Sequence, residues 1–200
     1  MRGWRFILYF VIGVAAFIWL VKVPILSNYL TGKLRNKVTI AWISIWPSKT
    51  TIRDLKIHNP EGFHSPFALK INQTHLAYRF KELIANPSVI EKIECDSLIL
   101  NIEVLKRESP SNNWMLINDL MQSSSSSESV QIRKLILTNL NIAIRDRDSS
   151  EQIITHHVDR LEWDDIQSER GFPVEQLIRK VFEGADLEQY IEGGFISDNL

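Results

Sequence analysis

The residues whose types could perform chemistry are two adjacent histidines, His156 and His157, followed by the carboxylates Asp159, Asp164 and Asp165. Imidazole and carboxylate groups together can bind a metal ion or exchange protons with a substrate. The surrounding residues are typical of a β-strand, and a strand sends neighbouring side chains to opposite faces. The two histidines therefore cannot ligate one ion without distortion, and we predict neither a metal site nor a catalytic site.

The other reactive side chains have simpler structural explanations. Cys95 occupies an apolar position of a predicted strand, where cysteine behaves as a small buried hydrophobe. Glu91, Lys92, Glu94 and Asp96 form a mixed charged face that is typical of a solvated strand. The chain has no Gly-x-Ser-x-Gly elbow, no glycine-rich phosphate loop and no paired histidines at helical spacing. We therefore expect a protein that is not an enzyme and needs no cofactor.

Composition and charge narrow the class of protein further. The chain has 200 residues, of which 44% are hydrophobic and 24% charged, so it is expected to fold into one or two domains. All 24 acidic residues lie beyond position 23, where 20 of the 23 basic residues also lie. This acidic balance argues against a nucleic-acid partner. The single cysteine cannot form an intrachain disulfide.

The N-terminal segment is continuously apolar. Phe6–Val21 contains no charge and is bounded by Arg5 and Lys22. As a helix it would be about 24 Å long, and its flanking cations can extend its reach across a hydrocarbon core of about 30 Å. We predict that residues 1–24 are an uncleaved transmembrane anchor. A cleaved signal peptide is the alternative, but the apolar run continues past the small residues Ala15-Ala16.

The residues after this segment are less informative. Positive charges are nearly balanced on its two sides, so they indicate little about orientation. Pro24 is expected to end or kink the helix. Residues 25–37 then form a juxtamembrane segment, which is either an amphipathic stretch at the bilayer surface or a plain linker.

From Val38 the pattern becomes typical of strands, and we assign residues 38–165 to a β-rich body. Thr51 to His58 is predicted to return beside the first strand, and Asn59-Pro60-Glu61-Gly62-Phe63 is predicted to be a tight corner. The next apolar positions, in Phe67–Ile71 and Leu76–Phe80, differ in parity. A bulge near Gln73 or Thr74 would return them to one face.

A repeat with an offset of 42 residues is the most informative pattern. Ile90-x-Lys92-Ile93-x-Cys95, with Leu98-x-Leu100-x-Ile102, matches Ile132-x-Lys134-Leu135-x-Leu137, with Leu140-x-Ile142-x-Ile144. In each copy the apolar parity changes once, which predicts a two-residue turn or a bulge.

A helix and a tether lie between the two copies of the repeat, and a strand and a second helix follow the second copy. An amphipathic helix is predicted around Trp114, and a serine-rich tether over residues 123–129. A further strand is predicted from Ile153 to Trp163. Residues 166–200 are predicted to be a C-terminal helix, starting after Pro173, and a loosely ordered tail.

Taken in order, several segments resemble one family. They are an N-terminal anchor, then Val38-Thr39-Ile40, Thr51-Ile52-x-x-Leu55-x-Ile57-x-Asn59-Pro60-Glu61-Gly62-Phe63, Phe67-Ala68-Leu69-Lys70-Ile71, Lys81-Glu82-Leu83-Ile84 and Val89-Ile90-x-x-Ile93. Asn112-Asn113-Trp114 is similar to the paired asparagines that open the family's short helix. On these segments the chain resembles the AsmA-like family of bacterial envelope proteins, whose larger relatives include the TamB and YhdP types. The family's long C-terminal groove is missing.

The resemblance implies a mainly β fold, in which an N-terminal transmembrane helix is followed by a curved antiparallel β-sheet with short helices. It also implies a single-pass inner-membrane anchor and a body in the periplasm, where a taco-like apolar groove accommodates acyl chains. The sequence is compatible with this, because strands apolar on one face need something to cover them. The predicted groove lining is Ile93, Cys95, Leu98, Leu100, Ile102, Leu135, Leu137, Leu140, Ile142 and Ile144.

The expected function is assistance with lipid transport or outer-membrane assembly in the cell envelope, with membrane lipids as partners. About nine strands would make a groove of roughly 40 Å, too short to bridge an envelope alone. Envelope proteins could therefore bind at open sheet edges. The alternative is a structural adaptor that recruits a protein partner to the inner membrane.

Overall fold

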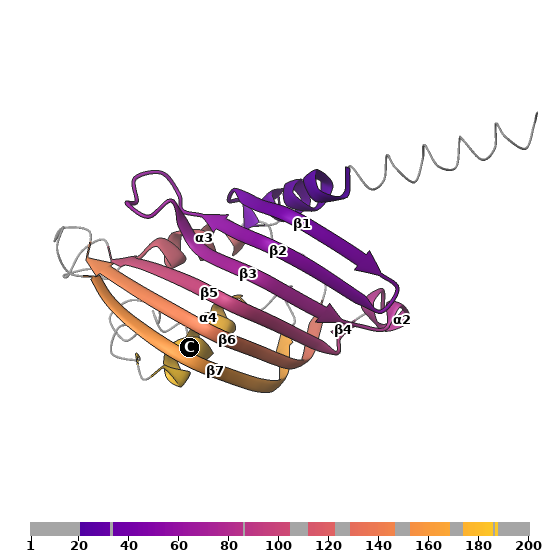
Figure 1. Ribbon diagram of the computed structural model, residues 1–200. Helices are drawn as coiled ribbons and strands as arrows, with labels where there is room; N and C mark the ends of the chain where they lie inside the picture. The colour runs from indigo at the N-terminus through magenta and orange to yellow at the C-terminus, as the bar shows by residue number, and fades with distance from the viewer. Residues whose placement is uncertain are drawn as a thin grey trace, which may run out of the picture.

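The fold is a curved, unclosed β-sheet of seven strands with a few short helices on one face (Figure 1). The computed structural model describes residues 21–32, 34–85, 87–104, 112–122, 129–146, 153–168, 174–185 and 187. The strands are β1 (Val38–Trp46), β2 (Lys49–His58), β3 (Phe67–Ala77), β4 (Ser88–Ile90), β5 (Lys92–Val104), β6 (Val130–Asp146) and β7 (Ile153–Ser168). The helices include α2 (Phe80–Leu83), α3 (Asn113–Gln122) and α4 (Val174–Gly184).

The sheet is mixed, so the prediction of an antiparallel sheet is wrong for the two pairs that β6 forms with β4 and with β5. Across the sheet the order is β1, β2, β3, β5, β6 and β7, and β4 continues the line of β5 beside the start of β6. β6 runs parallel to β4 and β5, whereas the other pairs are antiparallel. The connection from β5 to β6 carries α3 and returns to the same end of the sheet, as a parallel pair requires.

The two copies of the 42-residue repeat form the parallel pairing of β4 and β5 with β6. Ile93 pairs with Leu135, Leu100 with Ile142, and the same offset continues through the pairing of β4 with β6. The two copies therefore lie side by side in the same direction. Six strands side by side span about 24 Å, which is narrower than the predicted groove of about nine strands.

The change of parity within each copy comes from one residue in the left-handed region. Ser97 in β5 has φ 55° and Asn139 in β6 has φ 54°. Such a residue turns the strand so that Cys95 and Leu98, three positions apart, are both buried. Neither the predicted turn nor the predicted bulge is present, because β5 is one continuous strand and its register with β3 and β6 is the same on both sides of Ser97.

β3 changes parity at the same level of the sheet. Ile71 and Thr74, three positions apart, are both buried. The register of β3 with β2 and with β5 stays constant across this point, so no residue is inserted near Gln73 or Thr74. Neighbouring strands change face together, which lets the sheet keep its pairing without the predicted bulge.

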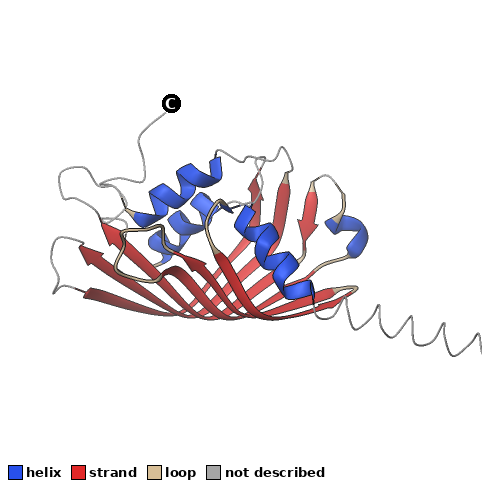
Figure 2. Ribbon diagram, turned by 90° about the horizontal axis from the view of Figure 1, so that it is seen from above, coloured by secondary structure: helices blue, strands red, loops and turns tan. Residues whose placement is uncertain are grey.

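The helices lie within the concave side of the sheet (Figure 2). The convex side carries charged side chains in ion pairs across and along the strands. Lys92 pairs with Glu94, and Glu162 pairs with both Lys134 and Arg160. Both cations donate hydrogen bonds to the Glu162 carboxylate, and these bonds lower its pKa to about 2. The bond from Lys134 has the larger effect. The sheet is thus apolar on one face and solvated on the other, as a one-sided sheet should be.

A helix over residues 21–32 covers the β1–β2 side of the concave face. Val23, Leu26 and Leu30, on one helical face, pack against a cluster that contains Ile43. The helix continues past Pro24, so of the two expectations for this residue, an end or a kink of the helix, the end is wrong. The apolar face of the helix packs on the sheet, so the first part of the predicted juxtamembrane segment, residues 25–37, is a helix and not a plain linker.

Several predicted features lie outside the described residues. They are residues 1–20 of the predicted anchor, residues 123–128 of the serine-rich tether, and residues 188–200 of the tail. Among the helices that are described, none combines the length and the apolar character needed to cross a membrane. The last strand, β7, extends to Ser168, beyond the predicted end of the body at residue 165.

Candidate functional site

The structure brings all ten predicted lining residues together on the concave face of β5 and β6. Each residue of β5 stands beside its repeat partner in β6. All ten are buried, with at most 7% of any side chain's residue surface exposed. They are Ile93, Cys95, Leu98, Leu100, Ile102, Leu135, Leu137, Leu140, Ile142 and Ile144.

The chain's own helices cover this face, so the expected open groove is not present in this structure. Trp114 and Ile117 of α3 belong to the same buried cluster. So do Ile178, Val181 and Phe182 of α4. The physical reason is that a large apolar surface in water is unfavourable, and an amphipathic helix of the same chain can cover it. The ten residues are therefore core residues when α4 lies on the sheet.

Polar side chains stabilise the point where the strands change face. An Asp96 carboxylate oxygen accepts hydrogen bonds from the Thr138 hydroxyl and the Asn139 amide, each at 2.8 Å, across the β5–β6 pair. These two donors, and then the Ser97 hydroxyl, lower the pKa of the Asp96 carboxyl. This side chain, predicted to be solvated surface, thus joins the two left-handed residues of the repeat.

The thiol of Cys95 is buried, as predicted. Burial raises its pKa to about 11, although a hydrogen bond between the Thr74 hydroxyl and the Cys95 sulfur acts in the opposite direction. Since only the thiolate reacts readily, we expect maleimide to leave the folded protein unmodified at neutral pH and to modify it completely in denaturant. Mass spectrometry before and after unfolding measures this. Rapid modification of the folded chain would contradict the burial of this face.

A second buried site, which the sequence analysis missed, surrounds Glu103 at the end of β5. This side chain is 0% exposed, and its carboxylate accepts hydrogen bonds from the backbone amides of His64 and Ser65. Burial acts to raise the pKa of the carboxyl, but the amides of Ser65 and His64 outweigh it, so the pKa is lowered. A carboxylate in β5 therefore holds the loop between β2 and β3.

Three asparagines extend this buried site to α3. The Asn113 amide donates to the Asn59 side-chain oxygen at 2.8 Å and to the Asn101 carbonyl at 2.9 Å. The Asn113 side-chain oxygen accepts from the backbone amide of Glu103 at 3.0 Å. Asn112 accepts from the first backbone amides of α3 and so caps this helix. The signal for this site was present in the paired asparagines and the Asn59 corner, but only the fold brings them together.

The two adjacent histidines lie on the last strand of the sheet, β7. His156 stands opposite Ile142 and His157 opposite Asn141, on successive positions of β7, and both are exposed. The His157 ring contacts the side-chain oxygens of Asn141 and Asp159, at 2.9 and 3.1 Å. In the described part of the chain, no group of three or more histidine, cysteine or acidic residues could hold a metal ion.

The fold places this chain in the class of proteins that are built on a curved, unclosed β-sheet. Helices of the same chain cover the apolar face of the sheet. No protein-family model matches the sequence, and no curated protein matches it significantly.

Proposed function

We propose that this protein is a membrane-anchored, non-enzymatic protein of the bacterial envelope that holds lipid acyl chains on its curved sheet, assisting lipid transport or outer-membrane assembly. The observation that carries the proposal is an apolar concave face, on an unclosed sheet, that short helices cover instead of a second sheet. A helix attached through connecting segments can leave such a face without breaking any strand pairing.

The energies involved allow α4 and an acyl chain to exchange. Three large side chains of α4, Ile178, Val181 and Phe182, are buried against the sheet cluster. Burying each is worth about 1.5–3 kcal/mol, or roughly 5–9 kcal/mol together. About ten methylene groups of an acyl chain, at about 0.8 kcal/mol each, would supply a similar amount. The sheet would therefore bind either cover with comparable free energy.

The proposed location is the inner membrane, with one pass and the body in the periplasm. The charge-free run Phe6–Val21 between Arg5 and Lys22 supports the membrane anchor, and the resemblance to the AsmA-like family supports the periplasmic side. A reporter fused after Leu200 that is active only outside the cytoplasm should be active. An inactive reporter on a stable, membrane-associated chain would contradict the periplasmic location.

Photo-crosslinking in cells tests the acyl-chain proposal with the full chain. Leu161 of β7 is half-buried and packs against the cluster under α4, whereas its neighbour Arg160 points to the exposed convex face. A benzophenone amino acid at position 161 should form phospholipid adducts, detected by mass spectrometry. The same group at position 160 is the matched control and should form several-fold fewer.

The structural adaptor is the second candidate, and the burial of all ten lining residues favours it. In the described sheet, the outer edge of β7 pairs with no other strand, and such an edge can receive a strand from a partner. If position 161 forms crosslinks only within the chain while an edge position of β7 captures a protein, acyl-chain binding fails and the adaptor is supported.

A further inference from the structure

Exposed apolar side chains gather at one corner of the sheet. Eight large apolar residues among those described are strongly exposed, and half of them belong to this corner. We call these four residues the apolar corner: Ile45 (59% exposed), Trp46 (66%), Phe80 (60%) and Ile84 (68%). The Tyr78 hydroxyl donates to the Trp46 carbonyl at 2.8 Å, which holds the end of β1 beside the end of β3 and the start of α2.

The short helix α2 is held on the sheet with Phe80 exposed. Glu82 pairs with Arg79 at 3.2 Å and with Arg133 of β6 at 3.7 Å. Arg133 also pairs with Glu91 at 2.7 Å. These ion pairs and the packing of Leu83 against the core cluster fix α2 on the sheet, and Phe80 and Ile84, four residues apart, point to solvent. The exposure of the two apolar residues is thus built into the fold.

The chain enters the body from the direction of this corner. In the helix over residues 21–32, the Thr31 hydroxyl accepts from the Val38 amide at 3.0 Å, at the start of β1. Lys22, near the other end of the helix, lies 5.9 Å from the centre of the Trp42 ring. The helix therefore runs antiparallel to β1, and its first described residue is directed toward the Trp46 end. The charge-free run Phe6–Val21 precedes it in the sequence.

The charges beside the apolar corner match an anionic surface. Lys49 and Lys81 are exposed there, on β2 and α2. Arg79 is neutralised by its pairing with Glu82 and Glu91. Exposed Trp and Phe side chains with flanking lysines are the composition that binds at the headgroup level of a bilayer, where nearby cations are attracted to anionic lipids.

We propose that the apolar corner is a membrane-contact surface. It binds the headgroup region of an anionic phospholipid bilayer and so holds this end of the sheet at the membrane. The body would then stand on the membrane with the loop between β2 and β3 pointing away from it. This contact does not depend on acyl-chain binding, because it uses the outer surface of the corner and leaves the concave face as it is.

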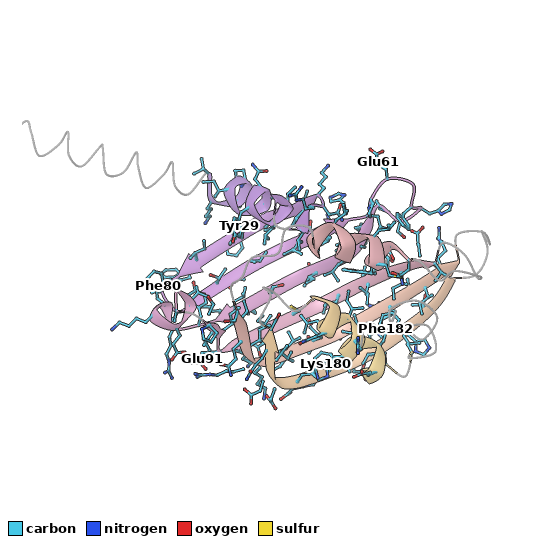
Figure 3. The ribbon with its side chains drawn as sticks, turned by 180° about the vertical axis from the view of Figure 1, so that it is seen from behind. Tyr29, Glu61, Phe80, Glu91, Lys180 and Phe182 are labelled. Carbon is cyan, nitrogen blue, oxygen red and sulfur yellow. The ribbon has the colours of Figure 1, made fainter. Side chains whose placement is uncertain are left out.

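A fluorescent label in the full chain tests this orientation. Phe80→Cys places the label in the corner, and Glu61→Cys places it at the opposite end of the sheet (Figure 3). Cys95 stays unlabelled because it is buried and its thiol pKa is raised to about 11. Both variants are reconstituted into vesicles of phosphatidylcholine and phosphatidylglycerol that carry a nitroxide lipid near the headgroups.

We expect several-fold stronger quenching of the label at position 80 than at position 61, and weaker quenching at position 80 when Lys49→Glu and Lys81→Glu are added. Equal quenching at both positions would overturn the proposal. It would also be overturned if position 80 became shielded only on adding an envelope protein extract, which would assign the corner to a protein partner. Circular dichroism of each variant checks that the fold is retained.

Discussion

Replacement of Ile142 by aspartate is expected to unfold the protein or to cost more than about 4 kcal/mol of its free energy of unfolding. Ile142 is 0% exposed and stands beside Leu100 in the centre of the β5–β6 pair. The substitution buries a carboxylate without a partner and removes a packed isoleucine, and both effects are destabilising. Domains of this size are stable by about 5–15 kcal/mol, so one such change can remove most of the stability.

A thermal melt of the full chain in mild detergent, followed by circular dichroism, measures this effect. The matched control is Ala143→Asp, one residue along β6 on the convex face, which should change the free energy of unfolding by about 1 kcal/mol or less. Leu100→Asp should behave like Ile142→Asp. If both variants fold as stably as the control, the concave face is open to water, and α4 does not cover it in solution.

Replacement of Glu103 by alanine is expected to cost about 2–4 kcal/mol. The change leaves the partly buried amides of His64 and Ser65 without their acceptor and removes a carboxylate that is itself buried, so these hydrogen bonds are lost with a cost of desolvation. The control is Glu94→Ala on the same strand, because that partly exposed carboxylate pairs only with Lys92 among the described ion pairs. Equal stability of the two variants, measured in urea, would show that the loop does not depend on Glu103.

The pH dependence of stability gives a second measurement on the same group. The pKa of the folded carboxyl lies below its ordinary value of 4.5, so the unfolded chain binds a proton more readily. The stabilisation by Glu103 is therefore complete above about pH 4.5 and is lost as the pH falls through the lower folded pKa. Glu103→Gln should be less stable than the wild type at pH 7, and the difference should shrink below pH 4.5. If the difference in stability between the two proteins did not change with pH, the ionised carboxylate of Glu103 would not be the stabilising form.

The sequence by itself determined the local elements and the pairing of the repeat. Alternating apolar residues are enough to indicate strands and the face that each buries, because a strand alternates its side chains between two faces. The offset of 42 residues, visible in Ile93 and Leu135 as in Leu100 and Ile142, became the register of β5 with β6. The corner at Asn59, the helix that begins at Asn113 and the helix that follows Pro173 are also where local preferences put them.

Only the tertiary structure decided what covers the apolar face and which distant polar groups meet. Periodicity shows that Ile142 faces an apolar layer, but whether that layer is α4, a lipid or a second sheet depends on long-range packing that no local pattern encodes. The parallel direction of β6 depended on the path of the connection through α3. In the sequence, nothing distinguishes Glu103 from the other polar residues of its strand. Its function depends on the backbone amides of His64 and Ser65, which are almost 40 residues away in the chain.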